Sequence, residues 1–462
     1  MKNPMIRQGM PVVVLGLGVT GKAAVRYLHA LGARVYVSDA KAEDSLSHDE
    51  KELLAECCEM YQGGAHAGEF IARGELIFVS PGIDHNLMEL KAAREAGVEI
   101  VGELSLAAPL LSGKIVAVTG TNGKTTVTTL VGKLLEASGM NPFVCGNIGL
   151  PLLECLMRKT LPDVVVVEVS SFQLETVGSF RPDIAILLNI TPDHLDRHGS
   201  FADYLLAKKN LFLNQGPEDK AIICADNVIC RELADQLTNV DTVLFGHSKE
   251  CHAYICDSQI YIKLDGVQEK YEISGTTFEN PIGRTNCAAA LLAAKICGCN
   301  HQAINGVLRS FKGLPHRMEM VDSINGVSYY NDSKATNTGA VISALRQTRG
   351  KVVLIAGGKD KGDDYSLLRE VVRQKVKNLI LIGEAAHLIA KQLDDIVTIE
   401  YAATMEEAVA KAVRLAECGD TVLLSPACAS FDMFSSYGHR GRSFVEAVKN
   451  FRSSLLSEQA GA

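Results

Sequence analysis

The chain has 462 residues, enough for about three domains that each bury a core of their own. Hydrophobic residues make up 47% and charged residues 22%, as in ordinary globular proteins, and the net charge of −8 disfavours a nucleic-acid surface. Because the 13 cysteines lack paired CxxC spacing and no long apolar stretch follows the N-terminus, we expect reduced cysteines, a cytoplasmic location and no membrane span.

The first predicted segment is built around a glycine-rich turn. An apolar strand over Pro11–Leu17 leads into Gly16-Leu17-Gly18-Val19-Thr20-Gly21, and a helix is expected over Lys22–Leu31. The next strand, Arg34–Ser38, is followed by Asp39 at the spacing of a dinucleotide-binding fingerprint. Two more strands are expected over Leu76–Val79, which ends in Ser80-Pro81-Gly82, and over Val98–Val101.

The second segment opens with a predicted phosphate-binding loop. The apolar run Ile115–Thr119 breaks into Gly120-Thr121-Asn122-Gly123-Lys124-Thr125-Thr126. Backbone N–H groups of these small residues can surround phosphate oxygens, Lys124 can supply a positive charge, and a threonine hydroxyl can reach Mg²⁺. Val118 occupies the position of the first glycine in the common form, so this loop is a variant. It predicts ATP or GTP binding, and a turn without a ligand is the alternative.

Two polar positions follow later strands of this segment. Glu168 ends a run of four valines, and a buried carboxylate there needs a partner such as nucleotide-bound Mg²⁺, although a salt bridge or a helix cap at Ser170-Ser171 would also serve. His194 lies beside Asp193 after another strand, which allows a metal or substrate role as well as a structural one. The strands expected here are Asp163–Glu168, Ile184–Asn189 and Lys220–Ala225, with a small β-rich insertion over Asp241–Thr277.

The third segment repeats the alternation of strands and helices after Leu314-Pro315-His316-Arg317. Tyr330–Asn337 places a carboxylate, an amine and several hydroxyl or amide groups in one turn, more than a turn needs. The polar turns Gly357–Gly362 and Ser425–Asp432 could belong to the same site or only cap helices. The expected strands are Val327–Tyr330, Val352–Ala356, Leu379–Ile382 and Val422–Ser425.

These segments predict an α/β chain of three domains with joints near residues 104 and 313. The expected boundaries are 1–104 for a Rossmann-like domain, 105–313 for a P-loop ATPase-like domain with a parallel sheet, and 314–462 for a second Rossmann-like domain.

The motifs together resemble the Mur ligases, three-domain ADP-forming ligases of peptidoglycan precursor synthesis. Thr119–Thr126 resembles their variant phosphate loop and Asp332–Asn337 their C-terminal signature. Glu168–Leu174, Leu314–Arg317 and Ser425–Ser430 are most similar to the members that add D-glutamate to UDP-N-acetylmuramoyl-L-alanine. The resemblance implies that the substrate carboxylate is phosphorylated by ATP and that an amine then displaces phosphate from the acyl phosphate.

The resemblance also assigns roles to individual residues. ATP would be bound by Gly120, Thr121, Asn122, Gly123, Lys124, Thr125, Thr126, Asn286, Arg317 and Asp332, and two Mg²⁺ ions by Thr125, Glu168, His194 and Lys208. Lys208 would carry a carbamate, with Lys209 as the neighbouring alternative, and the catalytic set would be Lys124, His194, Lys208 and Lys334. The UDP substrate would contact Gly18, Val19, Thr20, Asp39, Ala40, Ser80, Gly82 and Asn147, and D-glutamate would contact Thr336, Lys361, Ser430 and Phe431.

Four positions depart from the family pattern as the resemblance describes it. Ala289 replaces a second asparagine on the adenine side, Tyr437 replaces a phenylalanine near D-glutamate, and Ala40-Lys41 replaces a threonine–arginine pair at the UDP end. The contacts expected at these positions therefore stay open.

Several other functions are compatible with parts of the sequence. The glycine-rich turn and Asp39 alone would suit an NAD-dependent oxidoreductase, and the phosphate loop alone a nucleotide-switched binding module. A related ligase of other amino-acid specificity or a folylpolyglutamate synthase is the nearest alternative. We expect small-molecule substrates only, no nucleic-acid or membrane partner, and a monomer.

Overall fold

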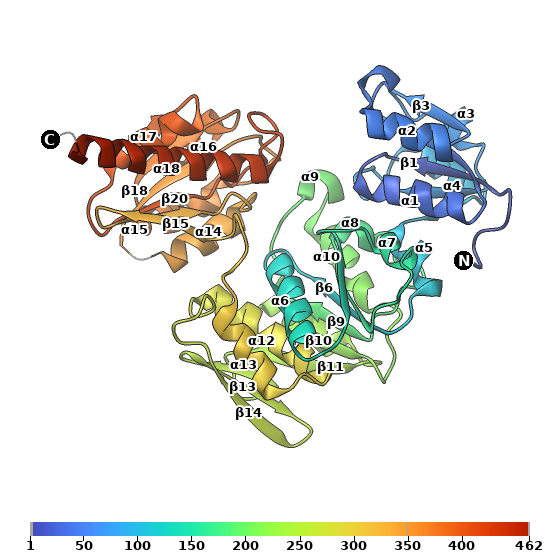
Figure 1. Ribbon diagram of the computed structural model, residues 1–462, viewed down its shortest axis with the longest axis horizontal. Helices are drawn as coiled ribbons and strands as arrows, with labels where there is room; N and C mark the ends of the chain where they lie inside the picture. The colour runs from blue at the N-terminus through green and yellow to red at the C-terminus, as the bar shows by residue number, and fades with distance from the viewer. Residues whose placement is uncertain (1–2, 349, 461–462) are drawn as a thin grey trace. The chain divides into compact units, whose positions relative to one another are not determined.

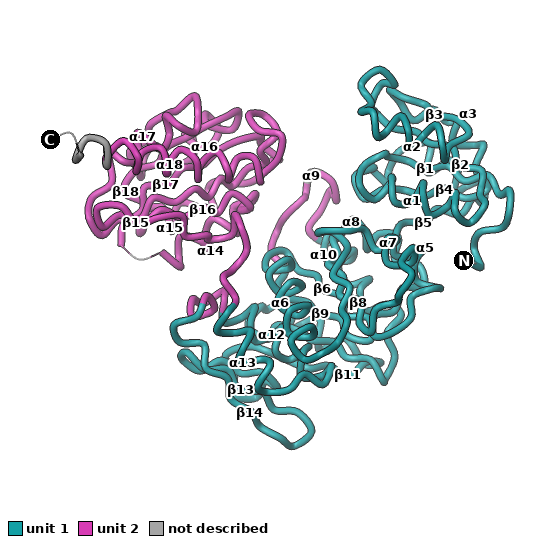
Figure 2. The backbone as a smooth tube through the Cα atoms, in the orientation of Figure 1, with its two compact units in different colours: residues 1–190, 202–276, 284–310 teal, residues 191–201, 277–283, 311–462 magenta. Residues whose placement is uncertain are grey.

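The computed structural model describes residues 3–348 and 350–460 and divides into two compact units. Unit 1 comprises Met1–Ile190, Ala202–Thr276 and Arg284–Ser310, and unit 2 comprises Thr191–Phe201, Thr277–Gly283 and Phe311–Ala462 (Figure 2). Strands and helices alternate through both units (Figure 1), which confirms the predicted α/β class.

Unit 1 begins with a five-stranded parallel sheet in the order β3-β2-β1-β4-β5. On one face Val13 and Ile77 pack against Phe70 and Leu90 of the covering helices. The strands are β1 (Pro11–Leu15), β2 (Arg34–Asp39), β3 (Met60–Gly63), β4 (Leu76–Val79) and β5 (Glu99–Val101), and the helices are α1 (Val19–Ala30), α2 (His48–Cys57), α3 (Gly68–Ile71), α4 (Met88–Glu95) and α5 (Glu103–Ala107).

The second sheet of unit 1 has nine strands in the order β14-β13-β12-β11-β10-β9-β6-β8-β7. It is parallel except for the β12–β13–β14 extension, which is antiparallel. The strands are β6 (Lys114–Thr119), β7 (Pro142–Gly146), β8 (Val164–Glu168), β9 (Ile184–Leu187), β10 (Lys220–Cys224), β11 (Asp241–Gly246), β12 (Ala253–Cys256), β13 (Gln259–Leu264) and β14 (Val267–Glu272). The helices are α6 (Lys124–Ala137), α7 (Leu152–Leu156), α8 (Ser171–Leu174), α10 (Phe201–Lys209), α11 (Val228–Gln236), α12 (Pro281–Ile296) and α13 (His301–Ser310).

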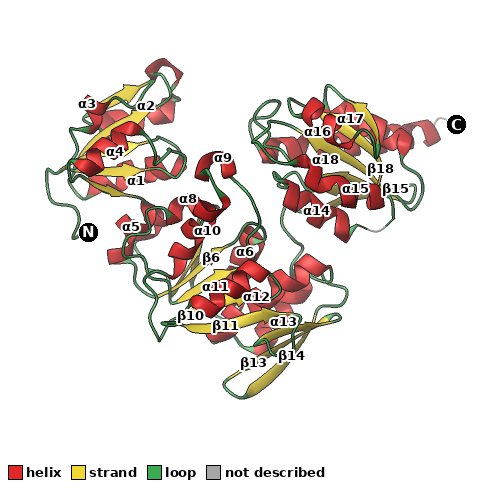
Figure 3. Cartoon of the chain, turned by 180° about the vertical axis from the view of Figure 1, so that it is seen from behind, coloured by secondary structure: helices red, strands yellow, loops and turns green. Residues whose placement is uncertain are grey.

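The sheet of unit 2 has six strands in the order β15-β16-β20-β17-β18-β19, with only β15 antiparallel among them. Helices cover both faces (Figure 3) because side chains of β17 alternate between two cores: Leu354 packs with Val341 and Ile389, whereas Ile355 packs with Val409 and Phe444. The strands are β15 (Glu319–Ile324), β16 (Val327–Asn331), β17 (Val352–Gly357), β18 (Val376–Ile382), β19 (Thr398–Tyr401) and β20 (Thr421–Leu424). The helices are α9 (Leu195–His198), α14 (Thr338–Gln347), α15 (Arg369–Lys375), α16 (Ala386–Leu393), α17 (Met405–Leu415) and α18 (Tyr437–Ala460).

The observed elements adjust the predicted boundaries at glycines and polar residues. The first strand ends at Leu15 because Gly16 has φ of 87°, and the helix begins at Val19 rather than Lys22. The strand predicted over Ile184–Asn189 ends at Leu187, which leaves Asn189 in the following loop.

Two general expectations can be compared with the described part of the chain. All 13 cysteines are free thiols and most are buried, as expected. None of the helices that the structure describes combines the length and hydropathy needed to cross a membrane.

Candidate active site

The phosphate loop joins β6 to α6 in the conformation that its glycines permit. Gly123 caps α6 with φ of 90°, and a Cβ built there would lie 2.4 Å from Asn286 Oδ1. Asn286 is itself buried, so an added methyl group could not be accommodated without moving it. The close approach explains why glycine stands at this position and brings Asn286 onto the loop, next to the backbone expected to hold phosphate.

Asn189 fixes the opposite side of the loop. Its carbonyl oxygen accepts the Thr121 N–H at 2.9 Å, and its side-chain Oδ1 accepts the Asn122 N–H at 2.8 Å. Its Nδ2 donates back to the Asn122 carbonyl at 3.0 Å. Three hydrogen bonds from one residue therefore hold the first half of the loop in a set conformation.

Two lysines meet at the carbonyl oxygen of Gly120. Lys124 Nζ donates to this oxygen at 2.9 Å and to the Thr121 carbonyl at 2.9 Å, and Lys208 Nζ donates to Gly120 at 2.9 Å. Lys208 is 1% exposed and its ammonium lies 4.7 Å from the centre of the Tyr204 ring, whose hydroxyl contacts Thr121 Oγ1 at 2.9 Å. Lys208 is therefore buried against the phosphate loop and hydrogen-bonded to its backbone.

Lys209, the neighbouring alternative, lies elsewhere. Its side chain is exposed and its Nζ donates to Gln236 Oε1 at 3.1 Å. The helix that carries both lysines therefore directs Lys208, and not Lys209, to the phosphate loop.

Glu168 lies one strand away from the loop, paired with Val118 in the β6–β8 register. It is 1% exposed, and its Oε1 accepts a hydrogen bond from Asn147 Nδ2 at 2.9 Å. Its Oε2 is buried without a hydrogen-bond partner among the described residues. A buried carboxylate oxygen in this condition is costly unless a cation compensates it, so the donor set fits Mg²⁺.

No group of three or more His, Cys, Asp or Glu side chains within residues 3–348 and 350–460 is arranged to hold a metal ion. A Mg²⁺ that is held by one carboxylate and by substrate phosphates does not require such a group.

The glycine-rich turn of the first sheet is held by two polar side chains. The Asp39 carboxylate accepts the N–H groups of Leu17 and Lys41, and Ser80 Oγ donates to the Gly16 carbonyl at 2.9 Å. A Cβ at Gly21 would lie 1.8 Å from the Gly16 oxygen, so this helix position requires glycine. Gly18, Val19, Ala40 and Gly82 are exposed around this turn, and Thr20 is half-buried.

Beside this turn, a buried glutamate forms ion pairs with two lysines. Glu50 Oε1 lies 3.0 Å from Lys41 Nζ and 3.5 Å from Lys22 Nζ. Its pKa is lowered to about 2, first by the Ser47 N–H and then by Lys41. Glu50 therefore fixes Lys41, the residue that departs from the family pattern, at the edge of the turn.

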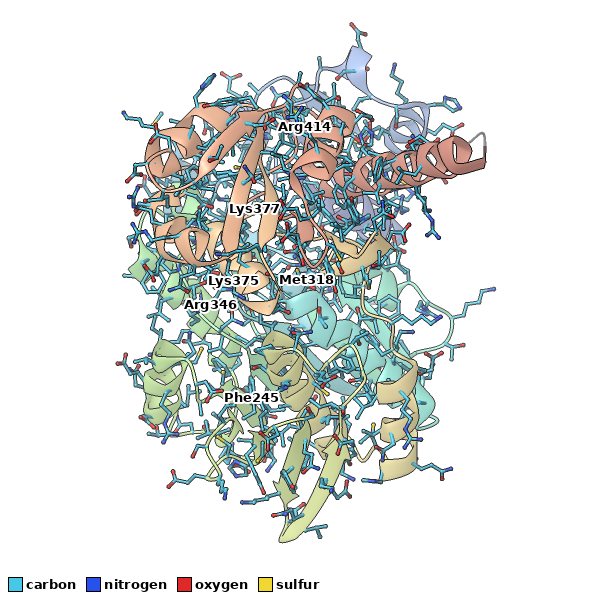
Figure 4. The ribbon with its side chains drawn as sticks, turned by 90° about the vertical axis from the view of Figure 1, so that its left-hand side faces the viewer. Phe245, Met318, Arg346, Lys375, Lys377 and Arg414 are labelled. Atoms are coloured by element: carbon cyan, nitrogen blue, oxygen red, sulfur yellow. The ribbon has the colours of Figure 1, made fainter. Side chains whose placement is uncertain are left out.

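In unit 2, Asp332 is fixed by hydrogen bonds at both oxygens. Oδ1 accepts the N–H of Met318, which lies just before β15 (Figure 4), at 3.1 Å, and Oδ2 accepts the Ser425 hydroxyl at 3.1 Å. Burial raises its pKa to about 7, against the lowering effect of these hydrogen bonds and of Arg317. Asp332 is therefore positioned as an acceptor that can also hold a proton near neutral pH.

The polar turns of unit 2 meet through a buried arginine. Arg440, fully buried, donates to Ser333 Oγ at 3.0 Å, to the Ser333 carbonyl at 2.9 Å, and to the carbonyls of Cys428 and Ala429 at 3.0 Å each. Burial lowers the pKa of Arg440 to about 10. Close by in sequence, Lys334 Nζ lies 3.9 Å from the ring centre of Tyr437.

Asp193 and His194 make contacts with other residues of unit 2. Asp193 Oδ2 accepts from Asn337 Nδ2 at 2.8 Å, its Oδ1 accepts the His194 N–H at 3.0 Å, and Lys361 Nζ lies 3.9 Å from Oδ1. His194 has φ of 54° and its Nε2 lies 3.7 Å from Asp193 Oδ2. The Asp193–His194 pair is thereby joined to the signature turn and to Lys361.

The predicted site residues therefore form groups within each unit. Unit 1 gathers the phosphate loop with Asn147, Glu168, Lys208 and Asn286, and separately the glycine-rich turn with Asp39 and Ser80. Unit 2 carries His194, Arg317, Asp332, Lys334, Thr336, Lys361, Ser430 and Phe431; Ser430 is 2% exposed, whereas Phe431 is 70% exposed.

Sequence reasoning assigned no individual role to three residues that organise these groups. Asn189, Ser425 and Arg440 each bond to a segment distant in sequence. Asn189 and Ser425 are the last residues of predicted strands, where polar residues could have been tested as candidates. Arg440 lies in an ordinary helical stretch and gave no signal.

Comparisons with known proteins cover nearly the whole chain. Residues 10–102 match the family described as Mur ligase MurD-like, N-terminal domain, residues 118–297 the Mur ligase middle domain, and residues 316–428 the Mur ligase, glutamate ligase domain.

Two curated relatives and one solved structure illustrate the likeness. The UDP-N-acetylmuramoylalanine–D-glutamate ligase of Desulfotalea psychrophila is 48% identical over 447 residues, 97% of each chain. The protein of the same name from Pelotomaculum thermopropionicum is 41% identical, covering 96% of this chain and 98% of its own. A pseudomurein peptide ligase type C from Methanothermus fervidus shares the fold, with a TM-score of 0.61, 20% identity, and coverage of 96% of this chain and 100% of its own. The chain belongs to the Mur ligase family.

Proposed function

We propose that the protein is an ATP-dependent, ADP-forming amide ligase that adds D-glutamate to UDP-N-acetylmuramoyl-L-alanine. The two relatives named for this activity align over nearly their full length, which supports the substrate assignment. The observation that carries the nucleotide part is Glu168, a buried carboxylate with one unpartnered oxygen beside a phosphate loop. In this proposal residues 1–104 bind the UDP end of the substrate, residues 105–313 bind ATP, and residues 314–462 bind the amino acid.

The phosphate loop would hold ATP through its backbone and its lysine. N–H groups of the loop and the Lys124 ammonium would bind phosphate oxygens, and Thr125 and Glu168 would hold a Mg²⁺ ion. When bound, Mg²⁺ would offset the negative charge of the phosphates. Asn286, Arg317 and Asp332 would contact the base, phosphates and ribose. Asp332 suits a ribose hydroxyl because it is a fixed acceptor.

Lys208 is proposed to carry a carbamate and, with His194, to hold a second Mg²⁺ ion. An ammonium at this position would repel a cation, whereas a carbamate is an anion with two oxygen donors. The burial of Lys208 against the Gly120 carbonyl supports the choice of this lysine over Lys209.

The acceptor and the amino acid would be bound by polar groups at the ends of other strands. Lys361, Thr336, Ser430 and the backbone of Phe431 would receive the carboxylates of D-glutamate. The UDP end would lie near Gly18, Val19, Thr20, Asp39, Ala40, Ser80 and Gly82, with Asn147 contacting the same substrate. Lys41, held by Glu50, offers a cation where the family pattern has arginine.

The chemistry requires activation because a free carboxylate is a poor electrophile. Transfer of the γ-phosphoryl group to the substrate carboxylate gives an acyl phosphate and ADP, and attack by the D-glutamate amine then releases phosphate. Lys124 and Lys334 would offset the negative charge on the oxygens of the phosphoryl group during its transfer. The N–H groups of the phosphate loop would hold that phosphoryl group in line with the substrate carboxylate.

A phosphate-release assay tests the amino-acid assignment. With MgATP and UDP-N-acetylmuramoyl-L-alanine, we expect release with D-glutamate and only background with L-glutamate, D-alanine, glycine or meso-diaminopimelate. Omission of the UDP substrate is the control. Release with another amino acid and not with D-glutamate would assign the protein to a related ligase of different specificity.

A pair of lysine variants tests the carbamate. We expect Lys208→Ala to lose activity, high bicarbonate to leave it inactive, and a short-chain carboxylate to restore part of it. Lys209→Ala is the matched control because this lysine is exposed and contacts only Gln236 among the hydrogen bonds described for it. A fully active Lys208→Ala enzyme would remove the carbamate from the mechanism.

A further inference from the structure

Tyr437, the first residue of α18, is one of the positions that depart from the family pattern, and the proposed reaction gives it no role. The centre of its ring lies 3.9 Å from Nζ of Lys334, which belongs to the signature turn Asp332–Asn337. A cation and an aromatic face attract each other out to about 6 Å, so the ammonium lies in direct contact with the ring. Tyr437 therefore contacts the lysine that the proposed reaction places on the phosphoryl group.

The backbone that carries the ring is joined to the backbone that carries the lysine. Ser333, which precedes Lys334, donates its hydroxyl to the Tyr437 carbonyl at 2.8 Å. Arg440, further along α18, donates to the Ser333 hydroxyl oxygen at 3.0 Å and to the Ser333 carbonyl at 2.9 Å. Because Ser333 and Arg440 are both fully buried, these hydrogen bonds hold the start of α18 against the signature turn.

His316 contacts both partners of the pair. Its carbonyl oxygen accepts the Lys334 N–H at 3.1 Å, and its ring meets the Tyr437 ring edge-on, with centres 6.3 Å apart and planes at 78°. A Cβ at Gly441 would lie 2.3 Å from His316 Nδ1, so a glycine in α18 allows the helix to approach this histidine. Three segments therefore fix the ring and the lysine relative to each other: the loop before β15, the signature turn and α18.

An aromatic ring is a suitable support for a lysine that must keep its charge. The face of the ring attracts an ammonium through its negative potential, yet the ring carries no net charge and does not neutralise the cation. Lys334 is half-buried and Tyr437 is 39% exposed, so a ligand from solvent can reach the pair.

We propose that Tyr437 is a positioning residue whose ring holds the Lys334 ammonium in place for phosphoryl transfer. The inference rests on the proposed role of Lys334 and adds a residue that acts through this lysine. Without the ring, the long side chain would occupy more rotamers, and part of its stabilisation of the transferring phosphoryl group would be lost. The hydroxyl takes no part in the contact, so phenylalanine should serve as well as tyrosine.

Removal of the ring should slow phosphoryl transfer and leave substrate binding largely unchanged. For Tyr437→Leu and Tyr437→Met we expect the single-turnover rate of ADP formation to fall by about threefold to tenfold, the range for a partly exposed cation–ring contact. The KM values for D-glutamate and for the UDP substrate should stay within about twofold. Tyr437→Phe should keep the wild-type rate within about twofold.

The kinetic experiment measures ADP formation by the full-length enzymes in excess over MgATP, with the UDP substrate and D-glutamate saturating. Tyr401→Leu is the matched control, because Tyr401 is another tyrosine of unit 2, 46% exposed at the end of β19, with its ring beside His387. This variant should keep the wild-type rate. The second non-aromatic variant, Tyr437→Met, gives the same test if leucine perturbs the start of α18.

NMR of protein labelled with ¹³C at lysine Cε supplies a readout that needs no substrate. The ring current of Tyr437 should displace the ε-methylene protons of Lys334 upfield in wild type and in Tyr437→Phe, and this displacement should vanish in Tyr437→Leu. Lys334→Arg identifies the signal by removing it.

The outcomes separate this inference from the proposed function. Slower ADP formation in both non-aromatic variants, recovered in Tyr437→Phe and accompanied by loss of the upfield displacement, supports it. Non-aromatic variants with the wild-type rate, a loss that Tyr437→Phe shares, a change confined to the KM for D-glutamate, or a displacement that survives in Tyr437→Leu each overturn it while the ligase assignment stands. Wild type that forms no ADP with its proposed substrates overturns the proposed function and, with it, the inference.

Discussion

Glu103 should make the stability of unit 1 depend on pH. It lies in α5 and is 2% exposed; Oε1 accepts the Leu153 N–H at 3.2 Å and Oε2 accepts from Gln173 Nε2 at 3.3 Å. Burial raises its pKa from 4.5 to about 7, although the N–H groups of Leu152 and Leu153 and the Gln173 amide act in the opposite direction. The folded chain therefore binds a proton at Glu103 more tightly than the unfolded chain does.

The sign of the effect follows from this difference. Because the folded pKa lies above the unfolded one, Glu103 adds stability at and below pH 4.5, and this contribution disappears as the pH rises through 7. At about 1.4 kcal/mol per pKa unit, the contribution is about 3 kcal/mol, of which most is lost between pH 5 and pH 8.

The substitution Glu103→Gln removes the titration. Glutamine stays neutral, so its free energy of unfolding relative to wild type should rise by about 2.5 kcal/mol from pH 5 to pH 8. At about 2 °C per kcal/mol for a unit of this size, the difference in Tm should shift by about 5 °C in favour of the variant. A constant penalty from the altered contact with Gln173 is expected at every pH and does not affect the slope.

Thermal unfolding and urea unfolding of both proteins at several pH values measure this slope. Glu136→Gln is the control, because Glu136 is exposed on α6 and is not among the groups that shift the pKa of Glu103. Its difference from wild type should stay level over the same range. A Tm difference between Glu103→Gln and wild type that is the same at pH 5 and pH 8 would refute the reasoning.

Two further substitutions test the loops of the site. Gly123→Ala should raise the KM for ATP at least tenfold, since its Cβ would lie 2.4 Å from Asn286 Oδ1; Gly139→Ala, at the other end of α6 with φ of 85° and open space, should leave that KM unchanged. An unchanged KM in Gly123→Ala would show that the loop tolerates the displacement. Arg440→Met should lower the free energy of unfolding of unit 2 by about 3 kcal/mol or more in urea, because buried carbonyls such as that of Cys428 lose their donor; a loss below about 1 kcal/mol would contradict the stabilising role assigned to this arginine.

Local sequence predicted the parts of the fold whose residues carry their own signals. The four valines before Glu168 form a strand that is buried on both faces, and the phosphate loop lies between a strand and a helix as predicted. Turn chemistry also located Asp332 and Lys334 at a strand end. Such features are encoded within about ten residues, so a single chain segment suffices to predict them.

Edge strands were harder to predict because half of their surroundings is solvent. β3 and β19 each begin and end with an exposed residue, and neither shows the continuous apolar run of a central strand. β15 carries mixed polar and apolar residues and pairs antiparallel with β16. Their pairing depends on a neighbouring strand that the local pattern does not reveal.

Polar contacts between residues far apart in the sequence could not be predicted, for a different reason. The bond from Asn337 to Asp193 spans 144 residues, and those from Arg440 to Ser333 span 107. The residues around Asn337 and Arg440 in the sequence do not indicate which distant residue accepts the hydrogen bond. The sequence alone therefore could not distinguish Lys208 from Lys209. In the structure Lys208 contacts the phosphate loop, whereas Lys209 lies exposed beside Gln236.

Burial alone does not show which carboxyl groups lack a hydrogen-bond partner within the protein. Glu103 and Asp332 have pKa values near 7, yet each has both oxygens in hydrogen bonds to the protein. Glu168, Asp363 and Asp432 instead each keep one buried oxygen without a partner among the described residues. A satisfied buried carboxyl stabilises a fixed arrangement, while an unsatisfied one costs free energy that a bound cation or a proton can recover. The unused oxygen therefore marks Glu168, which lies beside the phosphate loop, as a carboxylate whose burial a bound cation could offset.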